Sequence, residues 1–356
     1  MTLRERLAAL IRLEGPLAAD RFMEICLHDP DDGYYATRPD LGETGDFITA
    51  PLVSQMFGEL LGLWAAEVWA RLGRPPCVRL VELGPGHGVM MVDMLRAASL
   101  AEDFLPACDL WLVETSAPLR RRQAAALDGL GNPRWAARLE SVPGGAPVIL
   151  LANEFLDCLP IRQAMLTPSG WRERRIGVAA DGSLTFVLAE AVDPPAHWAG
   201  AAEGCLMERS AALIQCGRAI GERVAASGGA GLFIDYGRDA PGPGDTLQAL
   251  RGHAKVAPLE HPGEADLTAH VDFPAFLAAA RSAGARTGPI VGQGDFLAAL
   301  GVHARAAALA LARPDRAPTI ARQLERLVAH ERMGGLFKVA VVHAEGLEVP
   351  GFESAS

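Results

Sequence analysis

Lysine is nearly absent from this sequence, and no dense run of basic residues takes its place. Only Lys255 and Lys338 are lysines among the 33 lysine and arginine residues, and the formal net charge is −10. A protein dedicated to nucleic acid normally carries a basic patch or stripe, which this composition does not provide. The composition therefore disfavours a nucleic-acid partner, and we attribute the excess of arginine to a biased genome composition.

Paired cysteine motifs and long apolar runs are also missing. The six cysteines are scattered without a C-x-x-C pair, so the sequence indicates neither a metal site nor a disulfide framework. No apolar run reaches the roughly 18 to 20 residues that a membrane span needs. The first 15 residues combine glutamates with apolar residues at helical spacing, which is typical of an amphipathic helix rather than a signal peptide. We therefore expect a protein of a reducing compartment without a membrane span.

From Val78 onward the chain alternates short apolar runs with helical segments. This alternation predicts an α/β fold with a doubly wound parallel sheet of seven strands. A chain of 356 residues suits one large domain with insertions, or two domains. We expect an N-terminal helical region over 1–75 that covers the ligand site, a core from 76–160 and 229–356, an insertion over 161–228, and a helical insertion over 294–333.

Turn and capping residues predict the local structure outside this core. Two helices are expected within 1–28, followed by a long loop and by one helix from Thr49 to about Gly73. The insertion over 161–228 is expected to hold a hairpin that turns at Asp181 and Gly182, and then a helix that returns to the sheet. Both insertions would frame a groove for a polypeptide in a protein-modifying enzyme.

The stretch VRLVELGPGHGVMM, residues 78–91, is an apolar run that reaches Glu82 and is followed by Gly84, Gly86 and Gly88. Glycines between a strand and a helix let backbone N–H groups approach a ligand closely. A dinucleotide fingerprint requires G-x-G-x-x-G, whereas the third glycine here comes one residue earlier. The E-x-G-x-G-x-G spacing therefore disfavours an NAD enzyme; the alternative to a ligand loop is a tight turn without a ligand.

That spacing resembles the first motif of class I S-adenosylmethionine-dependent methyltransferases, which implies S-adenosyl-L-methionine as the cofactor. Such an enzyme needs an acid at the end of the next strand to accept the ribose hydroxyls, and Glu114 in LWLVETS stands there. The alternative for Glu114 is an acid that favours a helix N-terminus. The residues expected to bind the cofactor here are Glu82, Gly84, Pro85, Gly86, Gly88 and Glu114.

Further segments make the resemblance more specific. Together with the glycine loop, GDFITAP (45–51), NEFLDCLP (153–160), FIDYG (233–237), DLTAHVDF (266–273), QGDFL (293–297) and MGGLFKV (333–339) resemble the MidA family of class I methyltransferases. The resemblance implies a Rossmann-like methyltransferase fold and methyl transfer to protein arginine. Eukaryotic members of this family are mitochondrial and act on a respiratory complex I subunit during assembly. Without a Ser/Arg-rich leader at its start, this chain is expected to be a bacterial cytoplasmic protein.

The NEFLDCLP segment ends the strand PVILLANE, and ligands bind beyond the carboxyl ends of strands in a doubly wound sheet. An arginine guanidinium is protonated at neutral pH, so a site that methylates it needs carboxylates to hold it and to remove a proton. We therefore expect Glu154 and Asp157 to contact the guanidinium and Asn153 to lie near the transferred methyl and the cofactor. The alternative is that these residues cap a loop before Pro160.

Other residues are weaker candidates. Asp46, Phe47 and Thr49 are expected to close over the methionine end of the cofactor, as the resemblance implies, or else to cap and pack a helix. Asp235 and Tyr236 end a strand on the same edge and are expected to line the acceptor pocket. His270 is a candidate general base because histidine titrates near neutral pH. For His270 and for Gln293, a capping or turn role is the more ordinary interpretation.

Two other functions fit the same residues. A small-molecule N- or O-methyltransferase would favour a closed pocket lined with aromatic residues, which make up only 6% of this sequence. An assembly factor could keep the fold and bind the cofactor without turnover. The sequence does not specify the acceptor or the oligomeric state.

Overall fold

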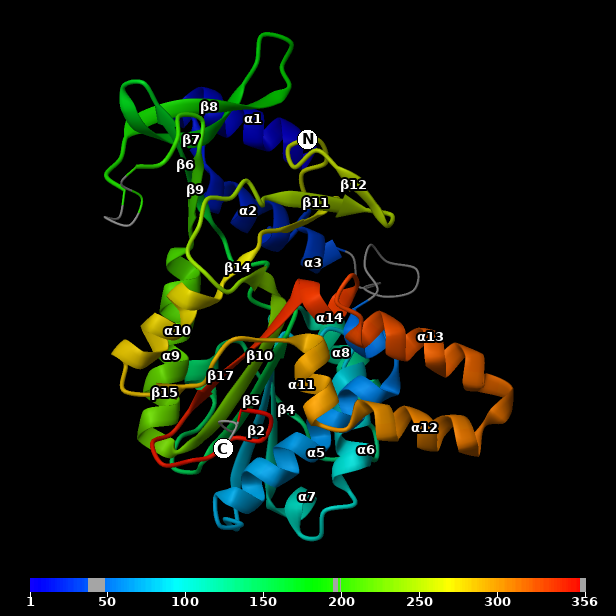
Figure 1. Ribbon diagram of the computed structural model, residues 1–356. Coiled ribbons are helices and arrows are strands. Elements are labelled where there is room, and N and C mark those ends of the chain that lie inside the picture. The colour runs from blue at the N-terminus through cyan, green and yellow to red at the C-terminus, as the bar shows by residue number, and fades with distance from the viewer. Residues whose placement is uncertain (38–48, 195–197, 199, 353–356) are drawn as a thin grey trace.

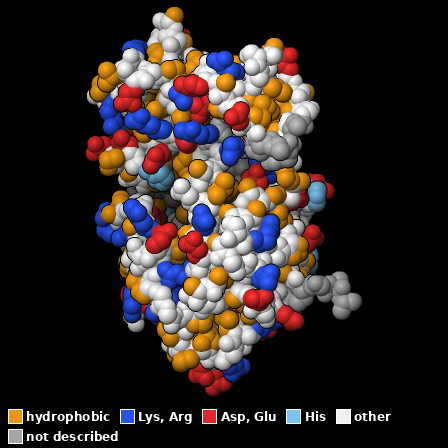
Figure 2. Space-filling view, turned by 90° about the vertical axis from the view of Figure 1, so that its left-hand side faces the viewer, with side chains coloured by type: hydrophobic (Ala, Val, Ile, Leu, Met, Phe, Trp, Pro, Cys, Tyr) orange, Lys and Arg blue, Asp and Glu red, His pale blue; other side chains and the backbone are white. Residues whose placement is uncertain are grey.

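The computed structural model describes residues 1–37, 49–194, 198 and 200–352, which form two lobes (Figure 1). The lower lobe is built on a large central sheet, and the upper lobe holds smaller antiparallel sheets and the N-terminal helices. On the side of the molecule shown in Figure 2, the surface is hollowed between the lobes, and acidic and basic side chains both border the hollow. Residues from both lobes form the candidate site.

The large sheet has the predicted doubly wound topology. Its path is β15 (Arg286–Thr287), β17 (Phe337–His343), β10 (Gly229–Arg238), β5 (Val148–Asn153), β2 (Val78–Leu83), β3 (Cys108–Val113) and β4 (Arg134–Ala136). The strands from β4 to β10 are parallel, and β17 runs antiparallel to β10. Short strands β14 (Val271–Asp272) and β16 (Val291–Gly292) pair with β10 and β17. The chain crosses in both directions from β2, so the carboxyl ends of β2, β3 and β5 meet at one edge.

Helices cover both faces of this sheet, which explains why its central strands are almost entirely buried and mostly apolar. Helices α5 (Gln55–Arg71) and α6 (Val89–Ala98) pack on one face, and α9 (Ala211–Ser227) and α10 (Phe273–Ser282) pack on the other. Each pair approaches closely at two glycines that are four residues apart. A Cβ on Gly62 would lie 2.2 Å from the Met94 carbonyl oxygen, and one on Gly221 would lie 2.4 Å from that of Ala280.

The upper lobe contains more strands than the sequence predicts. The expected hairpin is present as β7 (Gly170–Val178) and β8 (Leu184–Ala191), and it belongs to a five-stranded antiparallel sheet. The other strands are β1 (Leu17–Ala18), β6 (Arg162–Thr167) and β9 (Leu206–Arg209), and a separate sheet contains β11 (Gln248–Arg251), β12 (Ala254–Val256) and β13 (Asp266–Thr268). Their short, mixed patterns carry little periodicity, so only their partners reveal them as strands. Helices α1 (Leu3–Glu14) and α2 (Ala19–His28) complete the apolar core of this lobe.

Two local predictions were wrong. The helix expected from Thr49 is divided at Ser54, whose extended backbone separates α4 (Ala50–Val53) from α5, and whose hydroxyl accepts a hydrogen bond from Met56 N. Thr49 precedes α4, but its side chain makes no capping hydrogen bond. The expected long loop contains the short helix α3 (Tyr34–Thr37). Both departures turn side chains of the N-terminal region toward the edge where β2, β3 and β5 end.

The expected helical insertion forms α11 (Gln293–Ala299), α12 (Val302–Ala312), α13 (Ala317–Val328) and α14 (Met333–Leu336), of which α12 and α13 project as a helical hairpin (Figure 1). Within the described residues no single helix has the length and apolarity of a membrane span, although the bent pair α11 and α12 reaches them jointly by length and composition alone. Further helices are α7 (Phe104–Ala107), α8 (Ala117–Ala126), η1 (Leu139–Ser141) and η3 (Pro314–Arg316).

Candidate functional site

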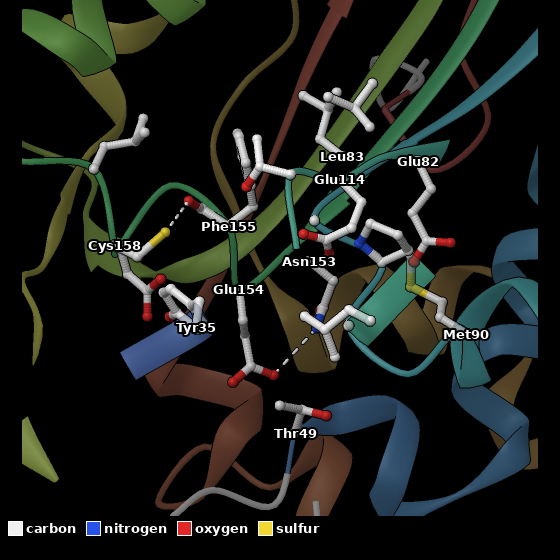
Figure 3. A pocket seen from close by; sticks show the side chains of 18 of the residues that line it. Tyr35, Thr49, Glu82, Leu83, Met90, Glu114, Asn153, Glu154, Phe155 and Cys158 are labelled. Atoms are coloured by element: carbon white, nitrogen blue, oxygen red, sulfur yellow. Dashed lines mark hydrogen bonds between the residues drawn. The ribbon is translucent and has the colours of Figure 1, made fainter. Parts of the chain in front are cut away.

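A cavity of about 460 Å³ lies at the carboxyl ends of β2, β3 and β5, where the two lobes meet. The glycine loop and Glu114 form one side, and the turn that follows Asn153 forms the floor. The upper lobe closes the other side with Tyr34, Tyr35 and Asp266. In Figure 3, Glu82, Met90 and Glu114 lie toward one end, Tyr35 and Cys158 toward the other, and Asn153 and Glu154 between them.

The glycine loop has the backbone that its sequence predicts. Gly84, Gly86 and Gly88 have φ angles of 62°, 51° and 81°. Residues other than glycine rarely adopt this backbone conformation. A Cβ on Gly84 would come within 2.8 Å of the Phe155 ring. Gly84, Pro85 and Gly86 line the cavity, whereas Gly88 lies just outside it as the residue before α6. The loop therefore presents bare backbone to whatever fills the cavity.

Glu82 is a buried carboxylate with an unused oxygen. Only 2% of the residue is exposed, it lines the cavity, and its Oε2 has no hydrogen-bond partner among the described residues. Burial raises the pKa of Glu82 to about 8. A buried carboxylate without a partner is costly, so a cation placed beside it would restore its charge and its hydrogen bonding.

Glu114 is held by neighbours on α8. Its Oε1 accepts a hydrogen bond from Ser116 N at 2.7 Å, and its Oε2 accepts one from Gln123 Nε2 at 3.2 Å. Burial raises the pKa of Glu114, although these hydrogen bonds oppose the shift. The carboxylate is thus fixed at the cavity wall, with lone pairs left for hydroxyl donors.

Gln123 is a residue of this site that the sequence did not suggest. It is completely buried, and its Nε2 also donates to the Gly86 carbonyl oxygen at 2.8 Å. Its Oε1 accepts a hydrogen bond from Trp135 Nε1 at 2.8 Å. The amide therefore joins the glycine loop to Glu114. A lone glutamine within a polar helix gives no sequence signal of this kind.

The turn after β5 brings Asn153 and Glu154 to the middle of the cavity. Glu154 Oε1 accepts hydrogen bonds from Ala50 N at 3.2 Å and from Asn153 Nδ2 at 3.1 Å. Glu154 has a φ of 51°, which is unusual for a residue with a side chain and marks a constrained position. Burial first, and Asp157 second, raise the pKa of Glu154 to about 7. Asn153 Oδ1, like Glu82 Oε2, is buried without a partner among the described residues.

Asp157 and Asp235 are neighbouring buried acids at this turn. Asp157 lines the cavity, and burial raises its pKa to about 6. Asp235 is completely buried beneath the turn and is not part of the cavity wall. Its Oδ2 accepts hydrogen bonds from Leu156 N at 2.9 Å and Asp157 N at 3.1 Å. Burial raises the pKa of Asp235 well above its ordinary value, and the neighbouring Asp157 and Glu154 add to that shift.

Three of the weaker candidates lie outside the cavity wall. Tyr236 is buried and contacts the rings of His270 and Phe337. The centroid of each of these two rings lies 5.6 Å from the centroid of the Tyr236 ring. His270 faces a separate cavity of about 210 Å³, and burial lowers its pKa. Gln293 is completely buried and donates to the Leu327 carbonyl oxygen at 2.9 Å, which fixes it in the protein interior. Thr49 does line the cavity, whereas Asp46 and Phe47 fall outside the described residues.

The upper lobe supplies a wall that sequence reasoning missed. Tyr35 donates a hydrogen bond from its hydroxyl to Asp266 Oδ1 at 3.0 Å, and its ring lies 5.2 Å from that of Tyr34 and 5.6 Å from that of His28. Tyr35 and Asp266 are 231 positions apart in the sequence, so no local pattern connects them. Tyr34 and Tyr35 therefore give the cavity an aromatic wall, although aromatic residues are scarce in the chain.

Comparison with known proteins agrees with this geometry. A family model of S-adenosyl-L-methionine-dependent methyltransferases matches residues 60–290. The mouse (Mus musculus) protein arginine methyltransferase NDUFAF7, mitochondrial, is 37% identical over 328 residues, which cover 83% of this chain and 73% of that protein. The Drosophila melanogaster homolog is 33% identical over 391 residues, with 99% and 88% covered. A Burkholderia thailandensis protein solved with bound S-adenosyl-homocysteine has a TM-score of 0.82 and 28% identity, and covers 99% of this chain and 93% of its own.

The doubly wound sheet and its glycine loop define a class I methyltransferase whose cofactor is S-adenosyl-L-methionine. The cavity fits such a molecule, because Glu82 and Asn153 offer unpartnered oxygens to a cation and Glu114 offers acceptors to hydroxyls. Within this class, the chain belongs to the MidA family. The family resemblance drawn from the sequence motifs is therefore confirmed.

Proposed function

We propose that this methyltransferase modifies an arginine side chain of a protein. The observation that carries the proposal is the set of carboxylates around the end of the cavity farther from Glu82. Tyr35 and Cys158 lie at that end, Asp266 accepts the hydrogen bond of the Tyr35 hydroxyl, and Asp157 precedes Cys158. Glu154 is the next carboxylate toward the middle of the cavity. Such a set suits a planar cation that must be held while it reacts. The relatives named as protein arginine methyltransferases support the same acceptor.

At the cofactor end, the unpartnered oxygens of Glu82 and Asn153 would bind the ammonium group of the methionine portion. Glu114 would accept hydrogen bonds from the ribose hydroxyls, and the backbone around Gly84 and Gly86 would let the ligand approach closely. When bound, the cofactor supplies a methyl group on a positively charged sulfur. These residues would hold the cofactor beside Asn153 and Glu154, and such positioning accounts for much of catalysis in methyl transfer.

At the acceptor end, Glu154 would fix one guanidinium nitrogen and take its proton as that nitrogen gains the methyl group. A pKa of about 7 suits this role, because a general base works best when its pKa lies near the working pH. Asp157 and Asp266 would hold the rest of the cation. Asp235 would act as a positioning residue, because it accepts hydrogen bonds from two backbone N–H groups of the turn that carries Asp157.

The test is transfer of labelled methyl groups from S-adenosyl-L-methionine to a lysate, followed by mass spectrometry of the labelled protein. We expect the label on arginine, and a respiratory complex I subunit is the first acceptor to examine, as the family resemblance implies. The Glu154→Gln variant is the control and is expected to leave the lysate unlabelled. Label on another residue type, or equal labelling by the variant, would contradict the proposal.

The tyrosines at the cavity wall favour one competing function, a small-molecule methyltransferase. The same experiment separates the two functions, because a small acceptor would carry the label into the low-molecular-weight fraction. An assembly factor without turnover would bind the cofactor and label nothing.

A further inference from the structure

A groove of about 680 Å³ opens beside the cavity on the outer surface. One wall comes from the segment that joins α1 to α2, and the other comes from Pro160 and Arg162 together with the start of α9. The groove and the cavity share His28, and the neighbouring residues Leu159 and Pro160 line one each. A chain lying in the groove would therefore pass directly beside the entrance to the acceptor end of the cavity.

The inner wall of the groove presents the unpaired edge of a strand. Leu17 and Ala18 form β1, which pairs only with β7 and ends the strand order of its sheet within the described part of the chain. Both residues line the groove. Leu17 is buried and Ala18 is half-buried, so this two-residue edge is reached only from within the groove. A strand edge without a partner strand offers backbone N–H and C=O groups, which are the groups that an extended peptide uses when it adds to a sheet.

The charges along the groove are mostly paired, with one exception near its junction with the cavity. Arg21 pairs with Glu14 at 2.8 Å, and Arg162 pairs with Asp20 at 2.7 Å. Glu24 is exposed and has no ion pair among the described residues. Glu24 lies one helical turn before His28, which lines both the groove and the cavity. An unpaired acid at this point favours a basic side chain in whatever occupies the groove.

We infer that this groove binds an extended polypeptide that flanks the methyl acceptor, through the free edge of β1 and a basic residue that faces Glu24. The inference rests on the proposed function and names the substrate class in more detail: an unfolded or extended segment with a basic residue close to the modified arginine.

The test is binding of the S-adenosyl-homocysteine-saturated protein to an array of short arginine-centred peptides with varied flanks. Ala211, an exposed residue at the groove wall, is changed to Trp to fill the groove. We expect Ala211→Trp to weaken peptide binding about tenfold, which corresponds to about 1.4 kcal/mol, and to leave cofactor affinity unchanged. Ala304→Trp, at an exposed position of α12 outside the groove, is the matched control and is expected to bind as the unaltered protein does.

The second variant tests the charge. Glu24→Arg is expected to reduce binding to peptides with basic flanks about two- to fivefold, as an exposed ion pair would, and to favour acidic flanks instead. Glu102→Arg, at an exposed acid between α6 and α7, is the control. The absence of array binding, or binding that survives Ala211→Trp unchanged, overturns the inference.

Binding and transfer together distinguish the two proposals. Peptide binding that requires the groove but yields no methylation would uphold the docking surface and reject arginine methylation of those peptides. Methylation of peptides and of a small guanidine at equal kcat/KM, unaffected by either groove variant, would uphold the proposed function and reject the docking surface.

Discussion

The two ends of the cavity are built in different ways. At the cofactor end, Glu82 lies on β2, the backbone of the glycine loop follows β2, and Glu114 directly follows the neighbouring strand β3. At the acceptor end, Glu154 and Asp157 from the lower lobe meet Tyr35 and Asp266 from the upper lobe. One end is therefore fixed by a local strand-turn-helix unit, while the other depends on how two lobes meet.

This difference separates two chemical tasks. The cofactor end needs close approach and a few fixed acceptors, which bare glycine backbone and buried carboxylates provide. The acceptor end has carboxylates whose pKa values are raised by burial, so burial disfavours their charged forms and an arriving cation favours them. Changes at one end should therefore affect binding, and changes at the other should affect transfer.

The largest effect is expected at the acceptor end. Glu154→Gln keeps an oxygen that can accept from Ala50 N and Asn153 but removes the base, so methyl transfer should fall about 100- to 1,000-fold. Affinity for S-adenosyl-homocysteine should change less than about threefold. Single-turnover transfer and calorimetric titration measure the two quantities. The control is Asp93→Asn, which changes a buried acid outside the cavity. If this variant transfers methyl groups as slowly as Glu154→Gln does, Glu154 is not the base.

Changing Gly84 should have the opposite pattern. Gly84→Ala forces a side chain into a φ of 62° and against Phe155, so cofactor affinity should fall about tenfold to a hundredfold. Gly129→Ala is the control, because Gly129 also has a positive φ, of 74°, but an added Cβ would have no atom within 4 Å. This variant should leave affinity unchanged. Calorimetry measures affinity, and thermal unfolding shows how much of any loss reflects stability. Equal affinity losses in both variants would mean that backbone strain alone, rather than the loop's contact with the ligand, explains the result.

The pH dependence of cofactor binding sharpens the same comparison. Free Glu82 has a pKa of about 8, raised by burial from 4.5, so its contribution to folding stability is greatest below about pH 4.5 and declines toward pH 8. A bound ammonium favours the carboxylate and lowers that pKa, so binding releases a proton. Affinity for S-adenosyl-homocysteine should therefore rise up to about tenfold per pH unit between pH 6 and 8. Glu82→Gln should weaken binding and flatten this slope; an unchanged slope would assign the proton to another group.

The smallest effect is expected at Gln123. Gln123→Leu leaves the Trp135 indole and the Gly86 carbonyl unpaired, so unfolding free energy should fall by about 1 to 3 kcal/mol and cofactor affinity by about threefold to tenfold. Gln293→Leu is a matched variant, because that glutamine is equally buried but lies away from the cavity. It should lower stability by less, because Gln293 donates one hydrogen bond and its buried Oε1 has no partner among the described residues, and it should not affect affinity. Equal affinity in both variants would show that Gln123 supports the fold alone.

The same division explains how far sequence reasoning reached. The strand before Glu82 and the glycines that follow it form a continuous local pattern, so the loop was predicted residue by residue. Tyr35 and Asp266 become neighbours only when the two lobes fold, and no spacing in the chain indicates this. Asp235 was expected at the acceptor wall because it ends a strand at the right edge. Asp235 does lie on β10, but the strand continues to Arg238, and its side chain lies beneath the turn, where it accepts hydrogen bonds from Leu156 N and Asp157 N.

The most direct test of this account is a crystal structure of the protein with bound S-adenosyl-homocysteine. We expect the ammonium group to lie against Glu82 and Asn153, the ribose hydroxyls to contact Glu114, and the sulfur to face Glu154. The position of the missing methyl would then lie between the two ends of the cavity. A ligand whose ribose leaves Glu114 unpaired, or whose sulfur faces away from Glu154, would contradict it.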